Sequence, residues 1–147
     1  MDGSGYSYAT WLFQWAFAAI TATIVSGAVA ERCTIVAYLC YSVAVISFIY
    51  PVVAQVGWGG GGKMSPWLGS DNKDDYFIEC GVIDVAGSGV VHMCGGVAAL
   101  VGATMLGPRQ SYKNGTIETP TYGPIFQFLG TLILLFGWCG FNGGSIL

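Results

Sequence analysis

One histidine lies inside a long apolar segment that also carries a carboxylate and a hydroxyl. The segment reads DVAGSGVVHMCGG, from Asp84 to Gly96, and His92 is the only histidine of the 147-residue chain. An ionisable side chain is costly at membrane depth, so it usually faces protein or a water-filled path. His92 therefore has three interpretations: a packed neutral histidine, a ligand of haem or a metal, or a pore-lining imidazole that relays protons. No second histidine is present to complete a metal site.

Asp84 precedes this histidine by eight residues, which is about 12 Å along a helix that rises 1.5 Å per residue. In the first turn of a helix, a carboxylate favours the positive end of the helix dipole and accepts hydrogen bonds from backbone N–H groups. Capping is the simpler interpretation of Asp84. An electrostatic role toward a cation is the alternative.

Aromatic side chains recur at helical spacing on the first and last apolar segments. These aromatic residues are Phe13 and Phe17 near one end of the chain, and Trp138 and Phe141 near the other. Ser145 continues the spacing of the second pair with a hydroxyl. Residues three or four apart share one face of a helix, and aromatic faces attract cations by about 0.5–2 kcal/mol. Together with Trp58, which follows the second apolar segment, these rings predict either a cation-binding vestibule or an interfacial aromatic belt.

The segments that carry these residues are long enough to cross a membrane. The chain is 54% hydrophobic and 9% charged, against about 25% charged residues in an ordinary soluble domain. Four runs contain no Asp, Glu, Lys or Arg: residues 3–30, 34–62, 85–108 and 119–147. A membrane-spanning helix needs about 20 apolar residues. We expect an all-α polytopic membrane protein with four transmembrane helices, at about residues 8–30, 35–56, 81–106 and 124–140.

Charge and cysteine usage exclude other classes of protein. A net charge of −3 without a basic stripe argues against binding to nucleic acid. The five cysteines show no CxxC motif and no paired spacing, so we expect neither a metal centre nor a disulfide framework. The first residues, MDGSGYSYAT, lack the basic region of a signal peptide. Under the positive-inside rule, Arg32, Arg109 and Lys113 lie on the cytoplasmic side and both ends of the chain lie outside.

Four segments resemble the ammonium transporter (Amt/Mep/Rh) family, in the order that the family has them. Residues 13–32, FQWAFAAITATIVSGAVAER, resemble its third transmembrane helix, and residues 49–62, IYPVVAQVGWGGGG, the end of its fourth. Residues 81–103, GVIDVAGSGVVHMCGGVAALVGA, resemble the fifth helix with its family signature, and residues 137–145, GWCGFNGGS, the sixth. The resemblance implies that residues 1–147 are one partial transporter domain of an eleven-helix fold.

The resemblance implies transport of ammonium or ammonia, with a role for each candidate residue. Trp58 and Ser145 would form an outer recruitment site for the cation. Phe17 and Phe141 would form a stacked phenyl gate beneath it, and Phe13 would line the approach. Ammonium and potassium are similar in size, so rings and a hydroxyl would select at the mouth, and a narrow apolar pore would exclude a bare cation.

Deeper in the pathway, the resemblance makes His92 the first of the family's two pore histidines. Ammonia would pass beside the imidazoles while they relay the proton separately. Asp84 would hold the structure near the recruitment site and favour the cation electrostatically. The resemblance also implies a homotrimer in the plasma membrane. It would work without enzymatic chemistry or a cofactor, and its partners would be ammonium or ammonia and the lipid bilayer.

Only helices resembling the third to sixth of the family are present, so these residues alone would not enclose a conduction path. We therefore expect a partial sequence of a full transporter. One alternative is a truncated regulatory relative that joins full-length trimers without conducting, which co-purification with a longer homologue would identify. The other is a four-helix membrane redox subunit with His92 as an axial haem ligand. A Soret band that disappears in His92→Ala would identify that protein.

Overall fold

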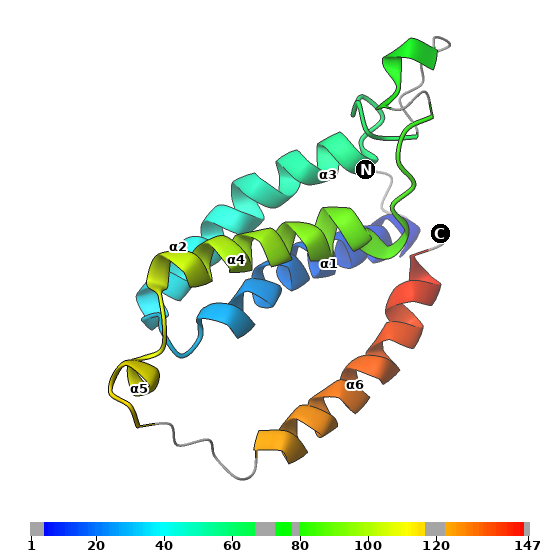
Figure 1. Cartoon of the computed structure of the whole chain (residues 1–147). Helices are drawn as coiled ribbons and strands as arrows, with labels where there is room; N and C mark the ends of the chain where they lie inside the picture. The colour runs from blue at the N-terminus through cyan, green and yellow to red at the C-terminus, as the bar shows by residue number, and fades with distance from the viewer. Residues whose placement is uncertain (1–4, 67–72, 78–79, 117–122, 146–147) are drawn as a thin grey trace. The chain divides into compact units, whose positions relative to one another are not determined.

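The computed structural model describes residues 5–66, 73–77, 80–116 and 123–145, and within them the chain is entirely helical or irregular (Figure 1). Four helical stretches are long and apolar enough to cross a membrane: Tyr8–Val29, Ile35–Trp58, Val85–Lys113 and Gly123–Gly144. The prediction of an all-α fold with four membrane-spanning helices is therefore confirmed. The chain divides into two compact units, Met1–Gly107 and Pro108–Leu147, which are described in turn.

The first unit begins with helix α1 (Gly5–Val29) and continues into a second long helical stretch. That stretch is built from α2 (Ile35–Ala44), the π-helix η1 (Val45–Ile49) and α3 (Tyr50–Trp58). Thr34 caps its start, since the hydroxyl accepts a hydrogen bond from the N–H of Ala37 at 3.3 Å. In a regular α-helix the ring of Pro51 would clash with the carbonyl four residues earlier, which accounts for the wider π-turn just before it.

The third stretch begins later than the sequence suggests. Residues 81–84 have no regular secondary structure, and the helical backbone starts with a tight turn, η4 (Val85–Gly87). It continues through the π-helix η5 (Ser88–Met93) into α4 (Cys94–Leu106). The helix expected from about Gly81 is delayed because Ala86 and Gly87 have left-handed φ angles of 58° and 75°, which an α-helix does not contain.

Helices α1 and α4 lie side by side and run in the same direction (Figure 1). Glycines of α4 allow their close approach. A Cβ atom on Gly95 would lie 3.0 Å from the carbonyl oxygen of Thr21, and one on Gly102 would lie 3.1 Å from Cγ1 of Val29. At the end of this seam, Nη1 of Arg32 donates to the carbonyl of Gly107 at 2.8 Å. The guanidinium thus satisfies a carbonyl that the end of α4 leaves open.

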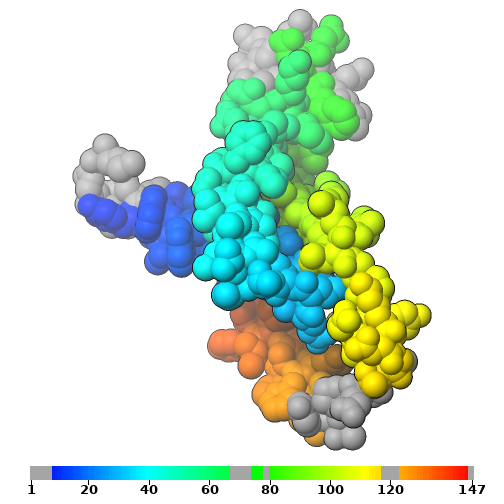
Figure 2. Space-filling view, turned by 90° about the vertical axis from the view of Figure 1, so that its left-hand side faces the viewer, coloured from blue at the N-terminus to red at the C-terminus, as the bar shows by residue number. Residues whose placement is uncertain are grey.

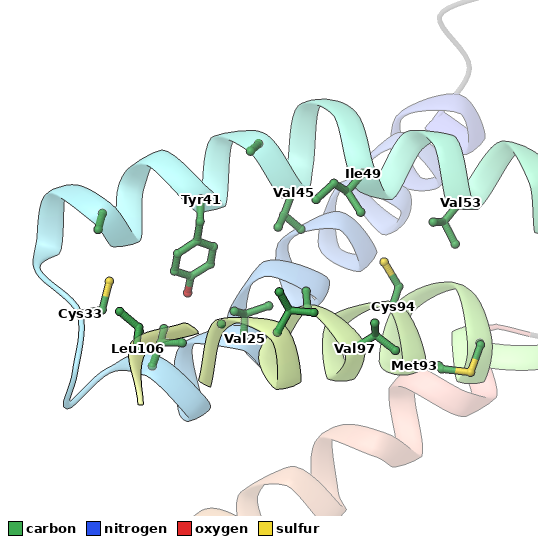
Figure 3. A pocket seen from close by; sticks show the side chains of 17 residues that line it. Val25, Cys33, Tyr41, Val45, Ile49, Val53, Met93, Cys94, Val97 and Leu106 are labelled. Atoms are coloured by element: carbon green, nitrogen blue, oxygen red, sulfur yellow. The ribbon is translucent and has the colours of Figure 1, made fainter. Parts of the chain in front are cut away.

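An apolar cavity of about 700 Å³ lies between α4, the Ile35–Trp58 stretch and α1. Figure 3 shows its lining side chains, which are mainly aliphatic and come from both stretches and from α1. Figure 2 shows part of the surface of the Ile35–Trp58 stretch. The exposed apolar residues of this stretch include Leu39 and Phe48. Apolar surface of this kind is what a membrane helix presents to lipid or to other helices.

The second unit contains the short helix α5 (Gln110–Lys113) and the long helix α6 (Gly123–Gly144). The expected end of this last helix was about Gly140, but α6 continues to Gly144 despite its glycines. A helix that spans a membrane must satisfy its backbone internally, and here the N–H of Ser145 bonds to the carbonyl of Asn142 at 3.3 Å.

Candidate functional site

Asp84 organises the start of the segment that carries the histidine. Its Oδ1 accepts a hydrogen bond from the N–H of Gly89 at 3.0 Å, and its Oδ2 accepts one from the N–H of Val90 at 2.8 Å. Both carboxylate oxygens therefore bind N–H groups that the first turn of η5 leaves without helical partners. This is the arrangement of a helix cap, with the negative charge at the positive end of the helix.

The same residue holds an indole through its main chain. The Nε1 of Trp58, at the end of α3, donates to the carbonyl oxygen of Asp84 at 3.0 Å. An indole has one N–H donor and no acceptor. This N–H is used in the bond to Asp84, so other contacts of the indole are made by the faces and edges of its ring.

Aromatic rings from two helical stretches meet at this point. The ring centroid of Phe17 lies 4.6 Å from that of Phe13, with a 65° angle between the planes, and 5.6 Å from that of Trp58, at 90°. Edge-to-face pairs of this kind add about 0.5–1.5 kcal/mol to the burial of the rings. Phe17 is only 2% exposed and Phe13 is half-buried. We name Phe13, Phe17 and Trp58 the aromatic stack.

His92 lies in η5 and is half-buried. Its Nδ1 is 3.1 Å from the carbonyl oxygen of Gly87. Gly87 also lies against the aromatic stack, because a Cβ atom there would be 3.3 Å from Cε1 of Phe17. The structure therefore connects the predicted residues Phe13, Phe17, Trp58, Asp84 and His92 through a continuous set of contacts.

Two glycines of this site were missed by the sequence analysis. Gly87 is one of them, and the other is Gly57, where a Cβ atom would lie 2.6 Å from Cγ2 of Val90. Gly57 brings α3 against η5 and so allows Trp58 to reach the carbonyl of Asp84. The sequence does place Gly57 directly before Trp58 and Gly87 three residues after Asp84. A glycine near a candidate site residue indicates that another segment approaches the backbone closely.

Phe141 and Ser145 lie at the end of α6, in the second unit. The hydroxyl of Ser145 donates to the carbonyl of Phe141 at 2.6 Å, so the two residues are linked along one helix face. The predicted pairs Trp58–Ser145 and Phe17–Phe141 each join a residue of the first unit to one of the second, and they stay predictions.

No group of three or more His, Cys, Asp or Glu side chains is placed to hold a metal ion within the described part of the chain. The cysteines at positions 33, 40, 80, 94 and 139 are free thiols. A free thiol in an apolar setting behaves as a small hydrophobic side chain.

A family model and the most similar curated proteins indicate the same family. Residues 1–147 match the Ammonium Transporter Family. Ammonium transporter Amt1 of Haloferax mediterranei is 46% identical to this chain over 97% of the chain and 27% of its own length. Ammonium transporter 1 member 1 is 45% identical in Oryza sativa subsp. japonica and 46% identical in Arabidopsis thaliana, covering 99% and 94% of this chain and 29% and 28% of their own lengths. The chain thus spans less than a third of these relatives. No solved structure matches it significantly.

Proposed function

The chain belongs to the ammonium transporter family, and from this membership we propose that its first unit forms the outer part of a pathway for ammonium or ammonia. The observation that supports this most is the aromatic stack, which is tied to the start of the histidine segment by the bond from Trp58 to Asp84 at 3.0 Å. The fold therefore combines a cation-attracting ring, a buried phenyl group and an imidazole along one run of contacts.

Recruitment of ammonium at the mouth follows from the chemistry of Trp58 and Asp84. The π-face of the indole attracts the cation, while its N–H is occupied by the carbonyl of Asp84. The carboxylate caps η5 and adds negative charge nearby. Ser145 would complete this recruitment site with a hydroxyl that accepts a hydrogen bond from the ammonium ion.

Passage beyond the mouth depends on Phe17 and the residues that follow it. Phe17 would form a phenyl gate with Phe141. Neither ring carries a polar group that could replace the water around a cation, so the gate would block an ion that has to give up its hydration shell. Ammonium loses a proton there, and neutral ammonia moves past His92, whose imidazole belongs to a separate route for the proton.

A complete path needs helices beyond the four seen here. We propose that residues 1–147 act within a longer transporter, a homotrimer of the plasma membrane, since the chain spans only 27–29% of the relatives described above. An antibody against residues 63–79 should detect a product several times heavier than 15.5 kDa in native membranes. A native product of 15.5 kDa would instead support the short regulatory relative.

The test of the pathway compares two tryptophan variants of the full-length transporter in cells without ammonium uptake of their own. Trp58→Leu removes the ring of the aromatic stack. Trp15→Leu is the matched control, because Trp15 lies on α1 with 56% of its surface exposed. We expect Trp58→Leu to raise the apparent KM for ammonium by about 2- to 30-fold, the ratio that corresponds to about 0.5–2 kcal/mol of cation–π attraction. Unchanged kinetics in Trp58→Leu, at equal membrane abundance, would remove the aromatic stack from the pathway.

A further inference from the structure

The chain folds back onto the end of α3 directly after Trp58. A helix leaves its last carbonyl groups without partners inside the helix. Here the N–H of Gly59 donates to the carbonyl of Gln55 at 3.1 Å, and the N–H of Met64 donates to the carbonyl of Val56 at 3.2 Å. Residues 59–66, which we name the return loop, therefore close the end of this helix with main-chain groups.

Gly62 is a point of very close approach between the return loop and α3. A Cβ atom there would collide with the carbonyl oxygens of Gln55 and Val56 and would lie 2.8 Å from the carbonyl carbon of Val56. These are main-chain atoms of a helix, which cannot turn aside as the end of a flexible side chain can. Gly62 is buried, whereas Gly61 is exposed and a Cβ atom there would meet nothing within 4 Å. The loop can lie this close to the helix because residue 62 has no side chain.

The main chain of Met64 joins the two segments that carry Trp58 and Asp84. Its N–H bonds to the carbonyl of Val56, which lies two residues before Trp58. Its carbonyl accepts a hydrogen bond from the N–H of Val82 at 2.7 Å, and Val82 lies two residues before Asp84. The end of α3 and the start of the third stretch are thus tied twice, once through the return loop and once through the indole bond of 3.0 Å.

The indole bond depends on the first of these ties. A hydrogen bond weakens steeply when donor and acceptor are misaligned, and one bond between neutral groups contributes little net stability by itself. The return loop holds the main chain on both sides of the bond, so the indole and the carbonyl of Asp84 meet without having to order two loose segments. A displaced loop would leave this alignment to the single bond.

We propose that Gly62 is a positioning residue of the recruitment site: it lets the return loop hold the segments of Trp58 and Asp84 at the separation at which the indole bond forms. This proposal rests on the transport function proposed above. Gly62 acts through Trp58 and not on ammonium itself. A side chain at residue 62 would lift the loop from α3, loosen the bridge at Met64 and release the indole.

The hold on the indole can be measured without transport, in the full-length transporter labelled with ¹⁵N at tryptophan. The signal of Trp58 is assigned by its loss in Trp58→Phe, and its indole N–H is then followed as it exchanges with D₂O. We expect slow exchange in the wild type, because the carbonyl of Asp84 holds this hydrogen. Exchange as fast as that of free tryptophan would overturn the proposal, whether or not a Gly62 variant accumulates.

Gly62→Ala and Gly61→Ala form a matched pair, because they add the same methyl group at adjacent positions of the return loop. Gly62→Ala should speed exchange of the indole N–H and leave the maximal uptake rate per transporter near the wild-type value. It should raise the apparent KM for ammonium by no more than Trp58→Leu does, about 2- to 30-fold. Gly61→Ala should match the wild type in all three. Wild-type exchange and KM in Gly62→Ala, or equal changes in both variants, would overturn the proposal.

A double variant separates positioning from a general loss of structure. Once Trp58→Leu has removed the ring, Gly62→Ala should raise the apparent KM no further. Additive effects of the two substitutions would mean that Gly62 does not act through the indole, which would overturn the proposal. If Trp58→Leu alone leaves the KM unchanged, the proposed pathway is wrong, and exchange of the indole N–H in Gly62→Ala still decides whether this glycine positions Trp58.

Discussion

The indole Nε1 of Trp58 and the main-chain oxygen of Asp84 are joined by a hydrogen bond of 3.0 Å, across 26 positions of sequence. The side chain of Asp84 binds the first N–H groups of η5 at the same time. One residue therefore connects the end of the second helical stretch to the start of the third. Asp84→Asn removes the charge and one of the two side-chain hydrogen bonds, and Asp84→Ala removes the charge and both bonds.

Asp84→Asn keeps one acceptor oxygen of the side chain and keeps the carbonyl that holds Trp58. Asp84→Ala removes the cap altogether, which should destabilise the protein by about 1–3 kcal/mol. We expect Asp84→Asn to reach the membrane at near wild-type abundance and to retain part of its ammonium uptake, and Asp84→Ala to be strongly depleted. Immunoblots of membranes and uptake assays measure both. Equal abundance of the two variants would argue against a capping role.

His92→Ala should change ammonium transport without removing the protein from the membrane, because the imidazole is half-buried and not a core packing group. Met93→Ala is the control in the same π-helix, since Met93 is 66% exposed. Uptake rate and the selectivity for ammonium over potassium are the measurements. If His92→Ala matched Met93→Ala in both, the histidine would have no part in the mechanism.

Phe141→Ala should alter selectivity or uptake far more than stability if this ring belongs to the phenyl gate. The control on α6 is Phe136→Ala, since Phe136 is 84% exposed in the second unit. Thermal unfolding of the solubilised protein and uptake are compared for the two variants. Loss of expression in Phe141→Ala alone would show that this phenylalanine serves packing instead.

The seam between α1 and α4 predicts a pair of compensating substitutions. Gly102→Ala places a Cβ atom 3.1 Å from Cγ1 of Val29 and should lower stability by about 1 kcal/mol or more through overpacking. Adding Val29→Ala removes that atom and should recover part of the loss. Gly95→Ala faces the carbonyl of Thr21 at 3.0 Å, a backbone atom that no side-chain change removes.

Thermal unfolding measures the seam, with Gly96→Ala as the silent control because no atom lies within 4 Å of its Cβ position. Additive effects of Gly102→Ala and Val29→Ala would mean that the two residues do not interact. A destabilised Gly96→Ala would mean that the loss does not come from the seam.

The membrane-spanning stretches could be predicted from the sequence because charge is excluded from lipid over a known length. The shared face of Phe13 and Phe17 could be predicted as well, because helical periodicity relates residues of one helix. Their ring contact at 4.6 Å agrees with that expectation.

Contacts between helices could not be predicted in this way. Periodicity does not say which residue of α1 meets Trp58, and the 5.6 Å contact with Phe17 depends on close approach at Gly57 and Gly87. The delayed start of the third stretch was also missed. The apolar run contains no signal that Ala86, the residue type with the highest helix propensity, has a φ of 58°.

The π-turn at Val45–Ile49 makes the orientation of Trp58 depend on the number of residues in the second stretch, and so on the number of codons that encode it. An extra or missing residue in a helix rotates everything beyond it by about 100°. An in-frame deletion of one residue in the regular helix α2 would therefore turn Trp58 away from Phe17 and Asp84, although every residue of the aromatic stack would still be present. A deletion inside Val45–Ile49 would instead convert the π-turn into a regular turn and leave Trp58 near its place. Natural relatives that keep this stack should therefore vary in residue count between Thr34 and Trp58 only at this turn.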